Sequence, residues 1–135
     1  MTLPTGAGSF KEAMIIDAEV YHTLKGVVKK KYGQDACNVG DGGSFAPNVH
    51  YNNEALDVLM EEIQKAGHAD KVKIGTDVVA SEFWKEDIKK YDLDFMNPSS
   101  GDDMKKTADE MIEYYKAWFA KCPFVSIEDL FDQDD

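Results

Sequence analysis

The sequence contains only two cysteines, Cys37 and Cys122, which lie far apart in the chain. Two cysteines are too few for the disulfide framework of a small secreted domain, so we expect free thiols and a reducing, cytoplasmic setting. No apolar run approaches the roughly 20 residues that a membrane-spanning helix needs. The first residues also lack the basic flank and the apolar core of a signal peptide. These absences favour a cytoplasmic protein without a membrane partner.

Basic residues are scarce relative to acidic ones. The 135 residues include 15 Lys and Arg against 26 Asp and Glu, which gives a net charge of -11. Proteins that bind nucleic acids usually present a basic face, so the composition predicts no nucleic-acid partner. Because 43% of the residues are hydrophobic, the chain can bury a core, and its length predicts one domain.

Two short runs rich in β-branched residues each carry an acid at their end. The run 71–77 ends at Asp77, and the run 124–129 contains Glu128. Both have the pattern of buried strands, and the periodic helical segment between them predicts a β–α–β crossover with parallel strands. Parallel neighbours finish at the same edge of a sheet. We therefore expect Asp77 and Glu128 side by side at the carboxyl end, where α/β folds bind their ligands.

Two carboxylates at such close range repel each other. At about 4 Å and an effective dielectric of about 20, the repulsion costs roughly 4 kcal/mol. A shared proton, a nearby cation or a divalent metal would offset it; alternatively, one acid caps a loop. Oxygen ligands on strand ends suit Mg²⁺, which usually takes one or two carboxylates together with water and substrate oxygens. Asp77 and Glu128 are therefore the candidate metal ligands.

Three segments have the periodicity of amphipathic helices. The expected N-caps are Ser9, Asn53 and Thr107, with capping boxes completed by Glu12 and Glu110. The expected buried stripes are Phe10, Met14, Ala18, Tyr21, Leu24 and Val28; Leu56, Leu59, Met60 and Ile63; and Ala108, Met111, Ile112, Tyr115, Trp118 and Phe119. Cys37–Val39 and Tyr91–Phe95 predict short strands, the second half-exposed and outside the main sheet.

A glycine-rich segment, Gly40–Ser44, predicts a loop that needs unusual backbone angles or the close approach of another group. It has neither the Gly-Lys-Ser/Thr of a P-loop nor a dinucleotide fingerprint. His22, His50 and His68 lack a second histidine or cysteine at metal-ligand spacing, so we expect ordinary surface or packing residues. The acidic stretch 129–135 adds no closing element to an open parallel sheet, which predicts a piece of a larger domain.

Ordered blocks along the whole chain point to one family. They are Ser9–Met14, Glu19–His22, Val39–Asp41, Phe45–Asn48, Lys73–Gly75, Ala80–Phe83, Tyr91–Phe95 and Val125–Asp129. With these blocks the sequence resembles enolase (phosphopyruvate hydratase). The resemblance implies an α/β fold, part of a (β/α)₈ TIM-like barrel of the enolase type with its ββαα start. It also implies that residues 1–135 are an incomplete segment of the C-terminal barrel domain, without the N-terminal α+β domain and the later half of the barrel.

The resemblance implies a function as well. The family's lyase reaction is the reversible dehydration of 2-phospho-D-glycerate to phosphoenolpyruvate in glycolysis, with Mg²⁺ as cofactor. A lysine removes the proton next to the carboxylate, and a glutamate helps the hydroxyl to leave. Asp77 and Glu128 align with two of the three carboxylates that hold the metal, and Glu128 also with a substrate-binding position. A small-molecule substrate, a cytoplasmic location and a homodimeric parent enzyme are further implications.

Three positions depart from the family pattern. Where the family has Gly-Asp-Glu-Gly-Gly, this chain has Gly40-Asp41-Gly42-Gly43-Ser44. Gly42 thus occupies the position of the acid-acting glutamate, and no catalytic residue of the family is present. Losing a general acid reduces the rate by roughly 10²- to 10⁴-fold. Leu130 replaces a proline. The remaining catalytic residues would lie beyond Asp135.

We therefore expect the 135-residue chain by itself to have no turnover. Two alternatives remain open. The first is a non-catalytic, Mg²⁺-binding acidic α/β module, although such modules carry an acidic pair after their first strand and a lysine after a late one. The second is a catalytically dead relative of enolase kept for binding, which Gly42 permits.

Overall fold

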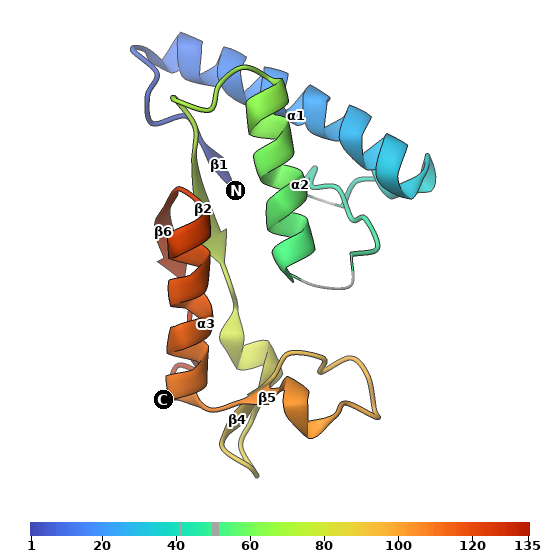
Figure 1. Cartoon of the computed structure of the whole chain (residues 1–135), viewed down its shortest axis with the longest axis vertical. Helices are drawn as coiled ribbons and strands as arrows, with labels where there is room; N and C mark the ends of the chain where they lie inside the picture. Colours follow the sequence, from blue (N-terminus) through green and yellow to red (C-terminus); the bar gives the residue numbers. More distant parts are fainter. Residues whose placement is uncertain (41, 50–51) are drawn as a thin grey trace. The chain divides into compact units, whose positions relative to one another are not determined.

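The computed structural model describes residues 1–40, 42–49 and 52–135. The chain forms two compact units. The helical unit consists of Thr2–Lys73, and the strand unit consists of Met1 with Ile74–Asp135. Figure 1 shows the helices and strands of both units along the chain. The fold is mixed α/β, as the sequence predicts.

The helical unit contains β1 (Thr2–Leu3), α1 (Phe10–Tyr32), the 3₁₀ helix η1 (Asp35–Cys37) and α2 (Asn52–Lys65). Ser9 caps α1 as predicted, because its hydroxyl accepts a hydrogen bond of 3.2 Å from the Glu12 N–H. The Glu12 carboxylate accepts from the Gly8 N–H instead of the Ser9 N–H, so the predicted capping box is shifted by one residue. Gly33 ends α1 with a positive φ of 92°, which glycine adopts without steric cost.

The buried face of α1 differs from the predicted stripe. Its buried residues are Ile16, Val20, Val27 and Val28. Of the predicted stripe, Val28 is buried and Leu24 half-buried, but Phe10, Met14, Ala18 and Tyr21 are exposed. The helix carries apolar residues on more than one face, and packing against α2 selects the face that closes around Val27, Val28 and Val58.

Two further predictions for the helical unit need correction. The segment Cys37–Val39 is not a strand, since Cys37 ends η1 and Val39 makes a single antiparallel bridge to Phe45. Helix α2 begins at Asn52, so Asn53 lies in its first turn and not at the N-cap. In α2, Ile63 is buried as predicted, but Leu56, Leu59 and Met60 are only half-buried, and Val58 and Glu62 are buried with Ile63.

The strand unit is built around β2 (Lys73–Asp77) and β6 (Phe124–Glu128), which pair in parallel. Helix α3 (Ala108–Lys121) precedes β6 in the chain, so the predicted β–α–β crossover is confirmed (Figure 1). The capping box of Thr107 and Glu110 is present in both directions. Met111, Tyr115 and Trp118 are buried as predicted, whereas Ala108 is half-buried and Ile112 and Phe119 are exposed.

A second sheet lies between β2 and α3 in the chain. It contains β3 (Trp84–Lys85), β4 (Lys90–Asp92) and β5 (Lys105–Lys106) in antiparallel order, with the 3₁₀ helices η2 (Ala80–Phe83) and η3 (Asp102–Met104) beside it in sequence. The predicted excursion outside the main sheet is confirmed. The strand itself differs from the prediction, because β4 includes only Tyr91 and Asp92 of the predicted run and both are buried, whereas Leu93–Phe95 lie in the turn that follows.

Aromatic rings form the core of the strand unit. Trp118 of α3 stacks on Phe124 of β6 with ring centroids 6.0 Å apart. Phe131, which follows β6, contacts both Tyr91 and Tyr115 edge-on. Rings in such offset or T-shaped pairs gain roughly 0.5–1.5 kcal/mol beyond their area burial. Among the helices of the described residues, none combines the length and the apolar character that crossing a membrane requires.

Candidate functional site

The two predicted metal ligands occupy partner positions on neighbouring parallel strands. The pairing of β2 with β6 begins at Ile74 and Phe124 and ends at Asp77 and Glu128. Between these points the register shifts, because Gly75 pairs with Ser126 and Val125 is left as an extra residue in β6. Such a β-bulge bends the strand and re-aims the side chains that follow it. Asp77 therefore lies beside Glu128 at the carboxyl end of the pair.

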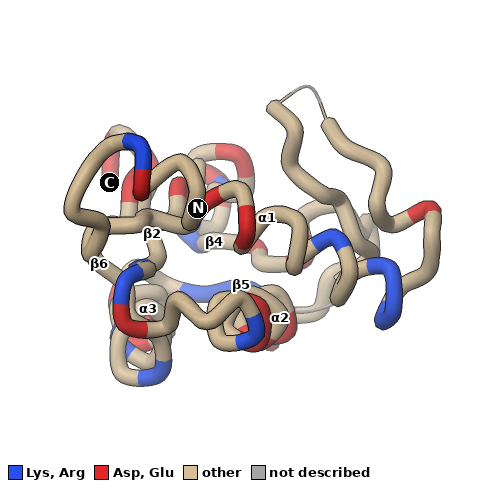
Figure 2. Tube along the Cα trace, turned by 90° about the horizontal axis from the view of Figure 1, so that it is seen from above, with Lys and Arg blue, Asp and Glu red and all other residues tan. Residues whose placement is uncertain are grey.

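The carboxylates of Asp77 and Glu128 are exposed and have no cationic partner among the described residues. Both residues are solvent-exposed, and neither appears in an ion pair or a side-chain hydrogen bond within the described ranges. Acidic residues are spread along the chain (Figure 2), and several of them have a lysine or histidine partner, as Glu12 has Lys71 and Glu19 has His68. The strand-end pair is thus free to bind a cation from solution.

These two residues fit a hard divalent cation as part of its ligand set. Partner residues of parallel strands project to the same face of the sheet, so both carboxylates are on one side. Within residues 1–40, 42–49 and 52–135, no group of three or more His, Cys, Asp or Glu could hold a metal. Mg²⁺ commonly takes one or two carboxylates and fills its octahedron with water and substrate oxygens. Asp77 and Glu128 are therefore candidate ligands, and the described residues add no third His, Cys, Asp or Glu to complete a group with them.

Backbone pairing continues beyond the last strand residues. The Val78 N–H donates to the Glu128 carbonyl, and the Ala80 N–H donates to the Asp129 carbonyl, both at 3.0 Å. Val79 and Asp129 have positive φ values of 52° and 49°. Sequence reasoning missed both residues. An aspartate tolerates the left-handed region better than most residues, but nothing in the sequence distinguishes Val79.

Two buried tyrosines fix the segment that follows Glu128. The Tyr115 hydroxyl donates a hydrogen bond of 2.9 Å to the Leu130 carbonyl. The Tyr91 hydroxyl donates to the Asp135 carboxylate at 2.6 Å and accepts from the Asp132 N–H at 2.9 Å. Burial, followed by the hydrogen bond to Asp135, raises the pKa of Tyr91 to about 12. Burial likewise raises the pKa of Tyr115. Both hydroxyls therefore stay protonated at neutral pH.

The glycine-rich loop belongs to the helical unit. Its ends are joined by the Gly40 N–H, which donates to the Ser44 carbonyl at 3.0 Å, and the Tyr21 hydroxyl donates to the Gly43 carbonyl at 2.8 Å. Tyr21 also stacks on Phe45 with ring centroids 4.7 Å apart. The exposed ring of Tyr21 therefore supports this loop, which explains why it is absent from the core of α1.

Gly42 and Gly43 differ in what the backbone requires of them. Gly43 has a positive φ of 77°, so a side chain there would be strained. Gly42 is exposed, its φ lies outside the left-handed region, and a Cβ built on it meets no heavy atom within 4 Å. The backbone thus leaves room for a glutamate at position 42. Asp41 lies outside the described residues.

A sequence model of the enolase C-terminal TIM barrel domain matches residues 1–135. The chain belongs to this family. It is therefore a member of the enolase superfamily, whose domains generally use Mg²⁺. In barrels of this kind, catalytic residues come from the carboxyl ends of strands, which is where Asp77 and Glu128 lie.

The departure from the family pattern at Leu130 has little effect on the contacts of the strand unit. Tyr115 binds the main-chain carbonyl of Leu130, and any residue, including proline, supplies that acceptor. The Leu130 backbone can thus hold its place after β6 whichever of the two side chains is present. Nothing in the structure explains Ser44.

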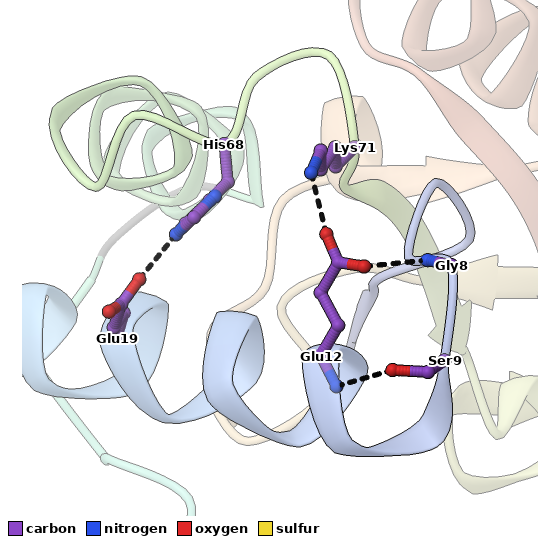
Figure 3. Close-up of polar contacts among 6 residues, drawn as sticks. All are labelled: Gly8, Ser9, Glu12, Glu19, His68 and Lys71. Carbon is purple, nitrogen blue, oxygen red and sulfur yellow. Dashed lines mark hydrogen bonds and ion pairs between the residues drawn. The ribbon is translucent and has the colours of Figure 1, made fainter.

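The histidines match the prediction of surface or packing residues where they are described. His68 Nε2 lies 2.6 Å from the Glu19 carboxylate, and Lys71 Nζ lies 2.6 Å from the Glu12 carboxylate (Figure 3). These contacts tie the segment after α2 to the first turns of α1. His22 is exposed beside the ring of Tyr21. His50 lies outside the described residues.

Proposed function

We propose that the chain is part of a cytoplasmic, Mg²⁺-dependent lyase that dehydrates 2-phosphoglycerate to phosphoenolpyruvate and water. The observation that carries the proposal is the register of β2 and β6, in which Asp77 pairs with Glu128. Two adjacent strand-end acids without a described cationic partner suit a divalent cation better than a structural role. Membership of the enolase family supports the same class of chemistry.

In this proposal Asp77 and Glu128 would hold the metal, and Glu128 would also contact the substrate. When bound, Mg²⁺ supplies a positive charge that stabilises the negative charge gathered on a substrate that loses a proton next to its carboxylate. The two acids hold their place because their strands are paired on both sides of the β-bulge. The parent enzyme would act on a small-molecule substrate as a homodimer.

Gly42 sets the expected level of activity. A leaving hydroxyl needs a proton, and glycine has none to give. A chain with glycine at the position of the acid-acting glutamate should therefore turn over roughly 10²- to 10⁴-fold more slowly than one with glutamate. The space around Gly42 favours a test by restoration, because the backbone accepts a side chain there.

The experiment replaces the homologous segment of a complete enolase with residues 1–135. We expect the chimera to form phosphoenolpyruvate slowly, and Gly42→Glu to raise kcat by at least about 100-fold. Gly42→Gln is the matched control, since it adds the same bulk without an acid. In the Gly42→Glu chimera, Asp77→Asn should abolish the gain.

The second candidate is a catalytically dead relative that binds its ligand but does not convert it. The observation that favours this candidate is Gly42, because neither the backbone angles nor the space at that position requires a glycine. A Gly42→Glu chimera no faster than its Gly42→Gln control would support this candidate and contradict the lyase. Turnover of 2-phosphoglycerate by the purified 135-residue chain would contradict the expectation that this chain is inactive by itself.

A further inference from the structure

We propose that Val79 and Asp129 are positioning residues, whose left-handed backbone locks the ends of β2 and β6 so that Asp77 and Glu128 stay adjacent. This inference rests on the proposed function, in which the two acids hold a divalent cation. It assigns a task to two residues that carry no motif and that act through their main chains.

The first observation is where the unusual backbone angles occur. Val79 has φ 52° and ψ 48°, and Asp129 has φ 49°; among the described non-glycine residues only Lys89, in the turn before β4, shares a positive φ, at 51°. A β-branched residue in the left-handed region is an outlier, because its Cβ substituents crowd the backbone. The two residues follow the two candidate ligands at a distance of two positions and one position. Such conformations persist only where the surrounding structure imposes them, and they gather at functional sites.

The second observation is what the turns accomplish. Val79 lies between two donors, and the turn at Val79 lets the Val78 and Ala80 N–H groups reach two successive carbonyls of the partner strand, at 3.0 Å each. Those carbonyls belong to Glu128 and Asp129. Ala80 is fully buried, so its hydrogen bond is shielded from water. The pairing therefore extends past the acids and encloses them between hydrogen bonds.

The third observation concerns what keeps Asp77 and Glu128 adjacent. The register between β2 and β6 changes at the bulge of Val125, so the pairing at Ile74 does not by itself dictate the pairing at Asp77. The two carboxylates repel each other, and no described side chain holds them together. The backbone bonds after the strands therefore add to the pairs that follow the bulge, which are Gly75 with Ser126, Thr76 with Ile127 and Asp77 with Glu128, in opposing slippage and separation.

The test uses three substitutions of one residue in the full chain. Asp129→Asn and Asp129→Gly remove the carboxylate but accept the left-handed conformation, whereas Asp129→Val removes the carboxylate and disfavours that conformation. The probe is Mn²⁺ alone, titrated by electron paramagnetic resonance, together with hydrogen exchange at the Val78 and Ala80 amides. We expect near-unchanged affinity for the first two, and roughly tenfold weaker binding with faster exchange for Asp129→Val.

Position 79 gives a second, independent arm. Val79→Gly should keep Mn²⁺ affinity and amide protection, because glycine adopts the required angles freely. Val79→Pro cannot take a positive φ and should lose both. Asp87→Asn, at an exposed acid away from the strand ends, controls for the change in net charge.

The outcomes distinguish a failure of the positioning role of Val79 and Asp129 from a failure of the proposed metal site. If Asp129→Asn and Asp129→Val weaken Mn²⁺ binding equally, the Asp129 carboxylate itself binds the metal, and the positioning role of its backbone is overturned. Unchanged exchange in both Asp129→Val and Val79→Pro would overturn it as well. If instead Asp77→Asn leaves Mn²⁺ affinity unchanged, the proposed metal site is wrong. Hydrogen exchange at the Val78 and Ala80 amides then still decides whether Val79 and Asp129 hold the strand ends together.

Discussion

The ion-paired acids of the helical unit differ from the two acids at the ends of β2 and β6, although the strand unit has ion pairs elsewhere, such as Glu113 with Lys116. In the helical unit, Glu12 pairs with Lys71, and Glu61 pairs with both Lys31 and Lys65. At the carboxyl ends of β2 and β6, two acids face solvent side by side without a cationic partner among the described residues. A paired surface acid fastens one segment to another. An unpaired acid beside a second acid costs stability, which is the usual mark of a binding function.

The buried acids of the two units differ in the opposite sense. Asp92, in the strand unit, accepts hydrogen bonds from the Asp94 N–H and the Ser100 hydroxyl. Glu62, in the helical unit, is fully buried, and its carboxyl oxygens have no hydrogen-bond partner among the residues that the structure describes. Burial is the main cause that raises the pKa of Glu62 to about 8; the Glu61 charge adds to it, and Lys31 and Lys65 oppose it. Burial without a partner thus keeps Glu62 neutral, whereas Asp92 is satisfied by its neighbours.

The largest expected effect comes from removing Glu62. Because the pKa of Glu62 is about 8 in the folded chain and ordinarily 4.5, the folded state binds more protons than the unfolded state between these pH values. Stability should therefore fall as pH rises from about 4.5 to about 8, by up to about 1.4 kcal/mol per pH unit. Glu62→Leu should abolish this slope and stabilise the chain at pH 7.5 by an amount on the order of 4 kcal/mol. Urea unfolding followed by circular dichroism across this range measures it.

Glu82→Gln is the control for the Glu62 experiment, because Glu82 is an exposed acid in the strand unit. The free energy of unfolding of Glu82→Gln should fall with pH as steeply as that of the unsubstituted chain. Glu62→Gln should remove the slope but gain less stability than Glu62→Leu, since its amide is as unpartnered as the acid. A pH slope that survives in Glu62→Leu would show that another group is responsible.

The next largest effect concerns the strand-end acids. Asp77→Asn and Glu128→Gln should each weaken Mn²⁺ binding by at least about tenfold, because each removes a charged oxygen ligand. The metal-free chain should become slightly more stable, since the repulsion disappears. Isothermal titration and thermal melts of the same samples measure both changes. A loss of stability without a loss of affinity would make the pair structural, in contrast to the comparison drawn above.

A moderate effect is expected from Tyr91→Phe. The change removes the donor to Asp135 and the acceptor of the Asp132 N–H, and the ring remains buried. We expect a loss of about 1–2 kcal/mol and faster hydrogen exchange at Asp132. Tyr115→Phe, which removes one hydrogen bond to Leu130, should cost less. Equal effects of the two substitutions would contradict the assignment of two bonds to Tyr91.

The smallest effect is expected for the ion pair of Glu12 and Lys71. The hydrogen bond from Lys71, and next that from the Gly8 N–H, holds the pKa of Glu12 below its usual value. The contribution of the Glu12 carboxylate to stability is therefore present at pH values above its usual pKa and is lost as the pH falls through the lowered pKa. Because the pair is exposed, Lys71→Met should lower the melting temperature only slightly, and less so in high salt. A double-mutant cycle with Glu12→Gln measures the coupling.

Some of this structure could be predicted because the chemistry is local. The capping box of Thr107 and Glu110 is satisfied within one helical turn, and Met111, Tyr115 and Trp118 follow one face of α3. The stripe of α1 was predicted wrongly for the complementary reason. Periodicity identifies an apolar face, but α1 has apolar residues on two faces, and only its packing partner selects the buried one.

The candidate site likewise has features that local sequence predicts and features that only the packing of two strands decides. Asp77 and Glu128 could be named as neighbours because each ends a recognisable strand and parallel strands finish together. The bulge at Val125 and the left-handed angles of Val79 and Asp129 were not predicted. They arise where two strands must match hydrogen bonds, and neither strand alone contains that constraint.

The sequence by itself determined the three helices, the parallel pair of strands, the acidic character of the chain and the two acids of the candidate site, because periodicity, charge and strand-end position are properties of consecutive residues. Only the tertiary structure decided that one extra residue in β6 is absorbed before Glu128, that the backbone turns at Val79 to continue the pairing, and that Tyr91 and Tyr115 hold the following segment. These features depend on groups far apart in the chain, whose hydrogen bonds exist only after the chain has folded.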